Sequence, residues 1–173
     1  FGAAYAAWAH FGDAAVYRAM HHGEPWALAD IAGHQVFILD FSFPPEFLET
    51  MARSANSVTQ IDHHASALNA WGDKLRPSDG GLRQYQHPTL PLYVVFNLDK
   101  SGARLAWENF HPDTPTPLAI RHIEDQDIWR FALPGTRAFC RALRLLPFDF
   151  ATWYQLVSET PNASAARYLE AIT

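Results

Sequence analysis

Three short apolar runs constrain the fold of this chain most strongly. They occupy residues 35–39, 57–61 and 92–96, and stretches with helical spacing separate them. Short continuous apolar runs are typical of strands that are buried on both faces of a parallel sheet, and strands that alternate with helices form α/β domains. The sequence therefore predicts an α/β fold with a mainly parallel β-sheet flanked by helices and a helical C-terminal end.

Proline positions, caps and helical spacing predict the remaining elements. Residues 14–20 are expected to form a short strand, and residues 72–91, which contain several Pro and Gly residues, a long irregular loop. The main domain is expected to span residues 1–146, and helices are expected to follow it at residues 147–173. Individual helices are expected at residues 1–11, 45–55, 65–71, 101–110, 117–127, 136–146, 149–158 and 162–169.

The charge balance limits the partners of the chain. The 13 basic and 18 acidic residues leave a net charge of -5, which argues against a broad surface for long double-stranded nucleic acid but leaves room for a small phosphorylated ligand. The single cysteine, Cys140, cannot form an internal disulfide, which fits a cytoplasmic location. No apolar run reaches the roughly 20 residues of a membrane helix, and the opening residues lack the basic region of a signal peptide. We therefore expect no membrane partner, and the sequence leaves the oligomeric state open.

Polar residues follow two of the expected strands at their carboxyl ends. Asp40 follows the first strand, and Asp62, His63 and His64 follow the second. Open α/β sheets bind ligands at this edge, and carboxylates with imidazoles suit hard or borderline metal ions. The alternatives are a helix cap for Asp40 and a hydrogen-bonded core position for His63. Residues 42–43 lie nearer the cap position, which leaves Asp40 for a metal.

Other candidate residues each leave two interpretations open. Asp125 and Asp127 end a helical run, and two acids that flank one residue cannot share a helix face, so one of them is expected to face a site. Ser101 precedes a helix, where it could cap the helix or help to form an anion site. A further helix carries a stripe of three arginines, Arg137, Arg141 and Arg144. This stripe faces either solvent or a phosphate.

Four ordered segments of the sequence resemble the DHH phosphoesterase superfamily, the RecJ-like phosphohydrolases. The resemblance covers roughly residues 1–145. It implies a Mn²⁺ ion pair, or a Mg²⁺ pair, at the carboxyl ends of the strands. The four segments are the opening helix from Phe1 to Trp8, Asp40 with the Asp62-His63-His64 triplet, residues 101–108, and residues 123–129.

The resemblance also implies a role for each candidate residue. Asp40 would bridge both ions, and His63 would bind one of them. Asp125 would bind the same ion as His63, with Asp127 as the reserve. Asp62 and His64 would be the catalytic groups beside the metal or the substrate. The residues that would contact substrate are Ser101 and Arg104.

The activity that the resemblance implies is hydrolysis of phosphoester or phosphoanhydride bonds in small nucleotides or short oligonucleotides by a two-metal mechanism. The superfamily's first metal motif would lie just before Phe1, and its smaller C-terminal domain would follow this chain. Because this sequence contains neither, we expect weak metal binding and an inactive fragment. The alternatives are a non-catalytic nucleotide-binding or regulatory module derived from such an enzyme, and a purely structural α/β domain.

Overall fold

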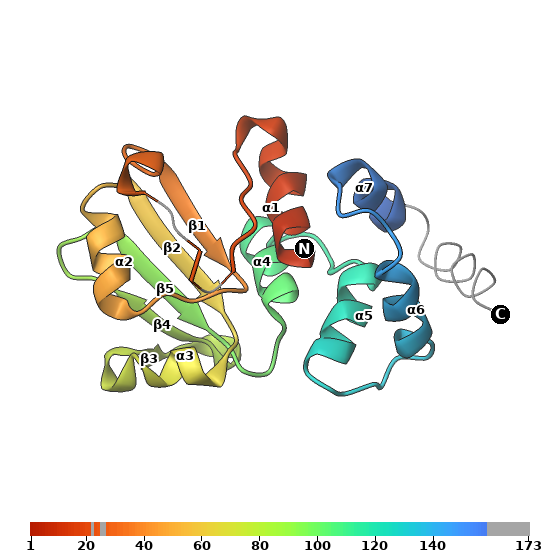
Figure 1. Ribbon diagram of the computed structural model, residues 1–173. Helices are drawn as coiled ribbons and strands as arrows, with labels where there is room; N and C mark the ends of the chain where they lie inside the picture. Colours follow the sequence, from red (N-terminus) through yellow and green to blue (C-terminus); the bar gives the residue numbers. More distant parts are fainter. Residues whose placement is uncertain (22, 25–26, 159–173) are drawn as a thin grey trace. The chain divides into compact units, whose positions relative to one another are not determined.

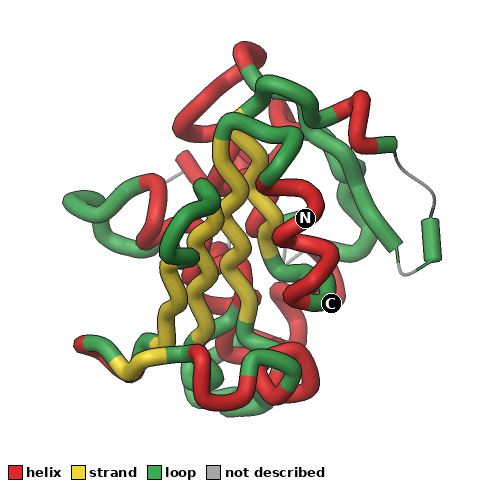
Figure 2. The backbone as a smooth tube through the Cα atoms, turned by 90° about the vertical axis from the view of Figure 1, so that its left-hand side faces the viewer, coloured by secondary structure: helices red, strands yellow, loops and turns green. Residues whose placement is uncertain are grey.

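A five-stranded sheet with the order β1-β2-β5-β4-β3 forms the centre of residues 16–102. The computed structural model describes residues 1–21, 23–24 and 27–158. In Figures 1 and 2 the strands lie side by side as one twisted layer. β1, β2 and β5 pair in parallel, and β4 and β3 extend the sheet in antiparallel pairs. The strands are β1 (Gln35–Leu39), β2 (Ser57–Asp62), β3 (Arg76–Pro77), β4 (Arg83–Gln86) and β5 (Leu92–Phe96).

The chain divides into two compact units, which we call the sheet unit and the helical unit. The sheet unit comprises residues 16–102, and the helical unit comprises residues 1–15 together with the chain from residue 103 onward. No helix in the described part of the chain is both long and apolar enough to span a membrane. A domain boundary after residue 146 stays a prediction.

One face of the sheet carries an apolar core under α2 (Pro45–Ala52). α2 contacts β2 and β5. Alternate residues of a strand point to the same face, which places the apolar side chains of β1, β2 and β5 together beneath this helix. Pro45 begins α2, where the missing N–H of proline costs no hydrogen bond. The buried core residues shared by the helix and the strands include Ile38, Leu48, Met51, Val58, Leu92, Val94 and Phe96.

The helical unit is built on packing between α5 and α6 and between α1 and α7. Phe139, Cys140 and Leu156 are buried together in this unit. Asp149 caps α7, because its carboxylate accepts the backbone N–H of Thr152 at 2.8 Å. The helices are α1 (Gly2–Phe11), α4 (Gly102–Phe110), α5 (Leu118–Asp127), α6 (Thr136–Leu143) and α7 (Phe150–Ser158).

The expected α/β class, a sheet that is mainly parallel at its core, and the helical C-terminal end are confirmed. The strand expected at residues 14–20 is wrong, because a short 3-10 helix (Gly12–Ala14) is followed by chain without strand pairing. The expected irregular loop at residues 72–91 is also wrong in part, since it contains β3 and β4. The sequences of β3 and β4 lack the alternation of apolar and polar residues that indicates a strand. β4 is a strand because it pairs with β5. The helix expected at residues 162–169 lies outside the described residues.

Candidate metal centre

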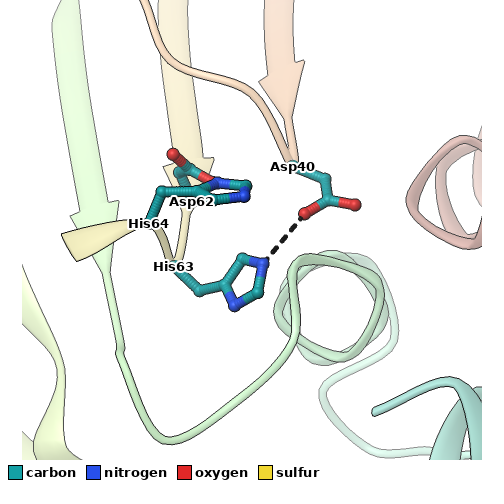
Figure 3. A group of neighbouring side chains, drawn as sticks. All are labelled: Asp40, Asp62, His63 and His64. Atoms are coloured by element: carbon teal, nitrogen blue, oxygen red, sulfur yellow. Dashed lines mark hydrogen bonds and ion pairs between the residues drawn. The ribbon is translucent and has the colours of Figure 1, made fainter. Parts of the chain in front are cut away.

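Four side chains gather where β1 and β2 end, namely those of Asp40, Asp62, His63 and His64 (Figure 3). Each of them offers one ligand atom, and these atoms all lie within 4.8 Å of one another. The fold explains this closeness, because Leu39 of β1 pairs with Ile61 of β2 in a parallel register. The residues that follow the two strands must therefore emerge together at the carboxyl edge of the sheet.

The backbone of Asp40 turns sharply as β1 ends. Its φ is +56°, a left-handed conformation in which Asp is several-fold more common than most residues. Its N–H donates to the carbonyl of Ile61 at 3.0 Å, which extends the ladder by one residue. The carboxylate then lies 3.3 Å from Nε2 of His63. Asp40 is 37% exposed and His63 is 11% exposed, so the pair lies at the edge of the protein interior.

Gly102, the first residue of α4, makes room for the Asp40 side chain. A Cβ atom added to Gly102 would overlap the carboxylate of Asp40 and its Cβ atom. A side chain at position 102 would therefore displace Asp40 from its place beside His63. This contact could not be predicted from the sequence, since the two residues lie far apart along the chain.

Asp62 is fully buried, and both of its carboxylate oxygens accept hydrogen bonds. Nδ1 of His64 lies 2.7 Å from one oxygen, and Oγ of Ser42 donates to the other at 2.5 Å. An ionised carboxylate can only accept, so Nδ1 of His64 donates this hydrogen bond, and Nε2 is the atom with the lone pair when the ring is neutral. The His64 side chain is 56% exposed. Asp62 therefore fixes both the tautomer and the orientation of an imidazole that solvent can reach.

The loop between β1 and α2 is held over β2 by two polar contacts. Ser42 contacts Asp62, and the backbone N–H of Phe43 donates to Oε1 of Gln60 at 2.9 Å. The sequence placed residues 42–43 nearest the cap of α2, but the N-cap residue is Pro44 and makes no side-chain cap. Ser42 is thus a site residue that the sequence missed. The one sequence signal that could have indicated this role is the position of Ser42, two residues after the aspartate at the end of a strand.

The four side chains fit a divalent metal ion by their chemistry. Two carboxylates and two imidazoles supply oxygen and nitrogen donors, a set that suits Mn²⁺ or Zn²⁺ better than Mg²⁺, which prefers oxygen alone. Two donor atoms at about 2.0–2.2 Å from one ion lie about 3 Å apart when they occupy neighbouring positions. The separation of 3.3 Å between Nε2 of His63 and Oδ1 of Asp40 agrees with such a pair.

Asp125 lies in the helical unit, where its buried carboxylate holds a loop. It accepts the N–H of Ala132 at 2.8 Å, the N–H of Leu133 at 2.9 Å and the hydroxyl of Thr136 at 2.5 Å. Burial by itself would raise the pKa of Asp125, but the hydrogen bonds from Thr136, Leu133 and Ala132 outweigh burial and lower the pKa. These bonds give Asp125 a structural task, and its expected role as a metal ligand stays a prediction.

The two expected substrate contacts have different surroundings. Ser101 is fully buried directly before α4. Arg104 donates from Nε to Glu108 at 2.8 Å and from Nη1 to Glu124 at 3.0 Å. Two carboxylates therefore balance the charge of Arg104 within the helical unit. Asp127, the reserve metal ligand, is exposed at the end of α5.

Comparison with known proteins gives one relative of undescribed function. The chain is 30% identical over 133 residues to an uncharacterised protein of Acanthamoeba polyphaga mimivirus. The match covers 76% of this chain but 28% of the viral protein, so the chain spans less than a third of that relative's length. No family model matches the chain, and no solved structure matches it.

Proposed function

We propose that this chain carries the metal-binding part of a metal-dependent phosphoesterase of the DHH type. The observation that supports the proposal is the group formed by Asp40, Asp62, His63 and His64 at one edge of a parallel sheet. The resemblance of the sequence to the DHH superfamily adds the reaction class. The proposed substrates are small nucleotides or short oligonucleotides, which suit the acidic balance of the chain.

In this proposal each residue of the group has its own task. Asp40 and His63 bind Mn²⁺, and Mg²⁺ is the second choice. The bound ions would lower the pKa of a water molecule and offset charge on the phosphoryl oxygens. His64, which Asp62 holds in one tautomer, moves a proton at Nε2. Ser101 and Arg104 stay proposed contacts to the substrate, and the cytoplasm stays the proposed location.

Manganese binding tests the metal centre directly. Titration calorimetry of the chain with Mn²⁺ should give one or two sites, and Asp40→Asn and His63→Ala should each weaken binding at least tenfold. His34→Ala is the matched control, because His34 is an exposed histidine of the sheet unit whose Nδ1 contacts its own loop at Ala32. Equal affinity in the wild type and both site variants would refute the metal centre.

Hydrolysis separates the enzyme from the non-catalytic alternative. Mn²⁺-dependent hydrolysis should be assayed on this chain and on the full-length product of its gene. The substrates to test are nucleotides, cyclic dinucleotides, short oligonucleotides and pyrophosphate. Cleavage that His64→Ala abolishes, with Mn²⁺ affinity kept, supports the enzyme. Nucleotide binding without cleavage in both versions would instead support a regulatory module.

A further inference from the structure

A basic and aromatic pocket lies in the helical unit, on residues that the proposed metal centre does not use. It has a volume of about 320 Å³, at the lower end of the range typical of small-molecule sites. The last turn of α5, the loop that follows it, and one side of α6 with its C-cap residue supply the lining. The lining residues are Gln126, Asp127, Trp129, Phe131, Arg137, Arg141 and Arg144.

The charge of this pocket is opposite to that of the chain. Three arginines face one carboxylate, that of Asp127, so the lining is positive although the whole chain carries a net charge of -5. No ion pair joins Arg141 or Arg144 to an acid in the described residues. These two guanidinium groups therefore have donors available for an anion, and the planar guanidinium suits the oxygens of a phosphate.

Trp129 supplies an aromatic platform beside these charges. Its side chain is 78% exposed, which is unusual for a large apolar ring. The ring of Phe131 stands nearly perpendicular to it, with the centroids 5.6 Å apart. The guanidinium of Arg137 lies 3.7 Å from the centroid of Phe131. That cation–π contact covers one face of Phe131, so Trp129 is the ring that offers a face to a ligand.

The backbone at this loop is strained and firmly held. Trp129 has a φ of +57° and Phe131 a φ of +50°, a conformation that costs bulky side chains free energy. Asp125 holds the loop, since its backbone carbonyl accepts the N–H groups of Arg130 and Phe131 at 2.9 and 3.0 Å. Its carboxylate accepts those of the next two residues. The fold thus maintains an unfavourable conformation that keeps Trp129 exposed.

We propose that this pocket binds a nucleotide, with the base stacked on Trp129 and the phosphate held by Arg141 and Arg144. Stacking on an aromatic ring and contacts from arginine to phosphate are the usual means of binding unpaired nucleotides. The Cα atoms of Arg137 and Arg144 are about 10 Å apart along α6, at 1.5 Å per residue. This row is long enough for more than one phosphate, so a short single strand should bind more tightly than a mononucleotide. The proposal is independent of the phosphoesterase function.

Fluorescence anisotropy with a labelled eight-nucleotide oligodeoxyadenylate tests the pocket. The chain is titrated in EDTA, so that neither metal binding nor metal-dependent cleavage contributes. Trp129→Ala should weaken binding about 5- to 150-fold, the effect of losing the stacking of one base on an aromatic ring. Arg141→Gln combined with Arg144→Gln should weaken binding and reduce its dependence on salt concentration. Tyr154→Ala and Arg121→Gln are the controls, because both side chains are exposed in the helical unit outside the pocket.

Two further comparisons separate this site from simpler explanations. Trp129→Gly should lose binding without lowering the urea midpoint, because glycine accepts a φ of +57°. A purely structural Trp129 would give a lower midpoint. AMP should displace the labelled oligonucleotide, but at a higher concentration than an unlabelled oligonucleotide needs. Inorganic tripolyphosphate should compete more weakly than an oligonucleotide of equal charge. Unchanged affinity in Trp129→Ala, or competition by tripolyphosphate equal to that of the oligonucleotide, would overturn the proposal.

Discussion

The variant Asp125→Asn tests whether this carboxylate serves the fold of the helical unit. Asp125 accepts three hydrogen bonds from Ala132, Leu133 and Thr136. An asparagine keeps only one side-chain oxygen. In its best orientation this oxygen still accepts the hydrogen bonds from Leu133 and Thr136, while the amide NH₂ group faces the backbone N–H of Ala132, so two donors meet. One bond to a charged group, which contributes about 1.5–3 kcal/mol, is then lost. The other two become neutral and each weakens by about 1 kcal/mol.

The expected loss is therefore about 3.5–5 kcal/mol of unfolding free energy. Urea unfolding followed by circular dichroism at pH 7, without metal, measures it from the midpoint and slope. Asp113→Asn, a change at an exposed aspartate of the same unit, should cost less than about 0.5 kcal/mol. Equal stability of Asp125→Asn and the wild type would refute the reasoning. A difference that emerges only after Mn²⁺ is added would also refute it, and would favour the metal-ligand prediction instead.

The pH dependence gives the same reasoning a second test. In the folded state the pKa of Asp125 lies below its ordinary value. Burial alone would raise this pKa, but the hydrogen bonds to the carboxylate lower it by more. The unfolded state therefore binds more protons near its own pKa of about 3.9. The contribution of Asp125 is complete above that value and is lost as the pH falls through the folded pKa. The gap between the wild type and Asp125→Asn should thus shrink as the pH falls below about 4.

Three further predictions concern single side chains. Gly102→Ala should weaken Mn²⁺ binding at least tenfold in calorimetry, because its Cβ overlaps Asp40; an unchanged affinity would contradict that contact. Ser42→Ala should lower the unfolding free energy by about 1–3 kcal/mol, since it leaves an oxygen of buried Asp62 without its donor; an unmoved urea midpoint would exclude this. Burial lowers the pKa of His122, so stability should fall as the pH drops below about 6.5, and His122→Asn should flatten the pH profile of the melting temperature between pH 7.5 and 5.5.

The sequence predicted the metal group because the rule behind it is local. A strand can be recognised from its own apolar residues, and the carboxyl ends of parallel strands meet at one edge. Asp40 and the triplet at Asp62, His63 and His64 could therefore be placed together without a structure. That inference needed β1 and β2 to be neighbours, which is the usual arrangement of consecutive strands.

The parts that sequence reasoning missed depend on contacts between distant residues. Ser42 reaches Asp62 across 20 positions, and Gly102 meets Asp40 across a longer separation. The hydrogen bonds to the carboxylate of Asp125 were also missed, because its three donors belong to residues 132–136, which follow the helix. β4 was missed because its residues, Arg83–Gln86, lack an apolar pattern and are ordered by pairing with β5.

The hydrogen bond between Asp62 and His64 orients an imidazole more than it stabilises the fold. Burying a carboxylate costs several kcal/mol, and the two hydrogen bonds it accepts return about 1.5–3 kcal/mol each, so the net effect on stability is small. A neutral asparagine could accept the hydroxyl of Ser42 at a lower desolvation cost. The charged carboxylate of Asp62 instead accepts the N–H at Nδ1 of His64, and so fixes the tautomer of an exposed imidazole. In the proposed phosphoesterase, an imidazole held in this way would move a proton at Nε2.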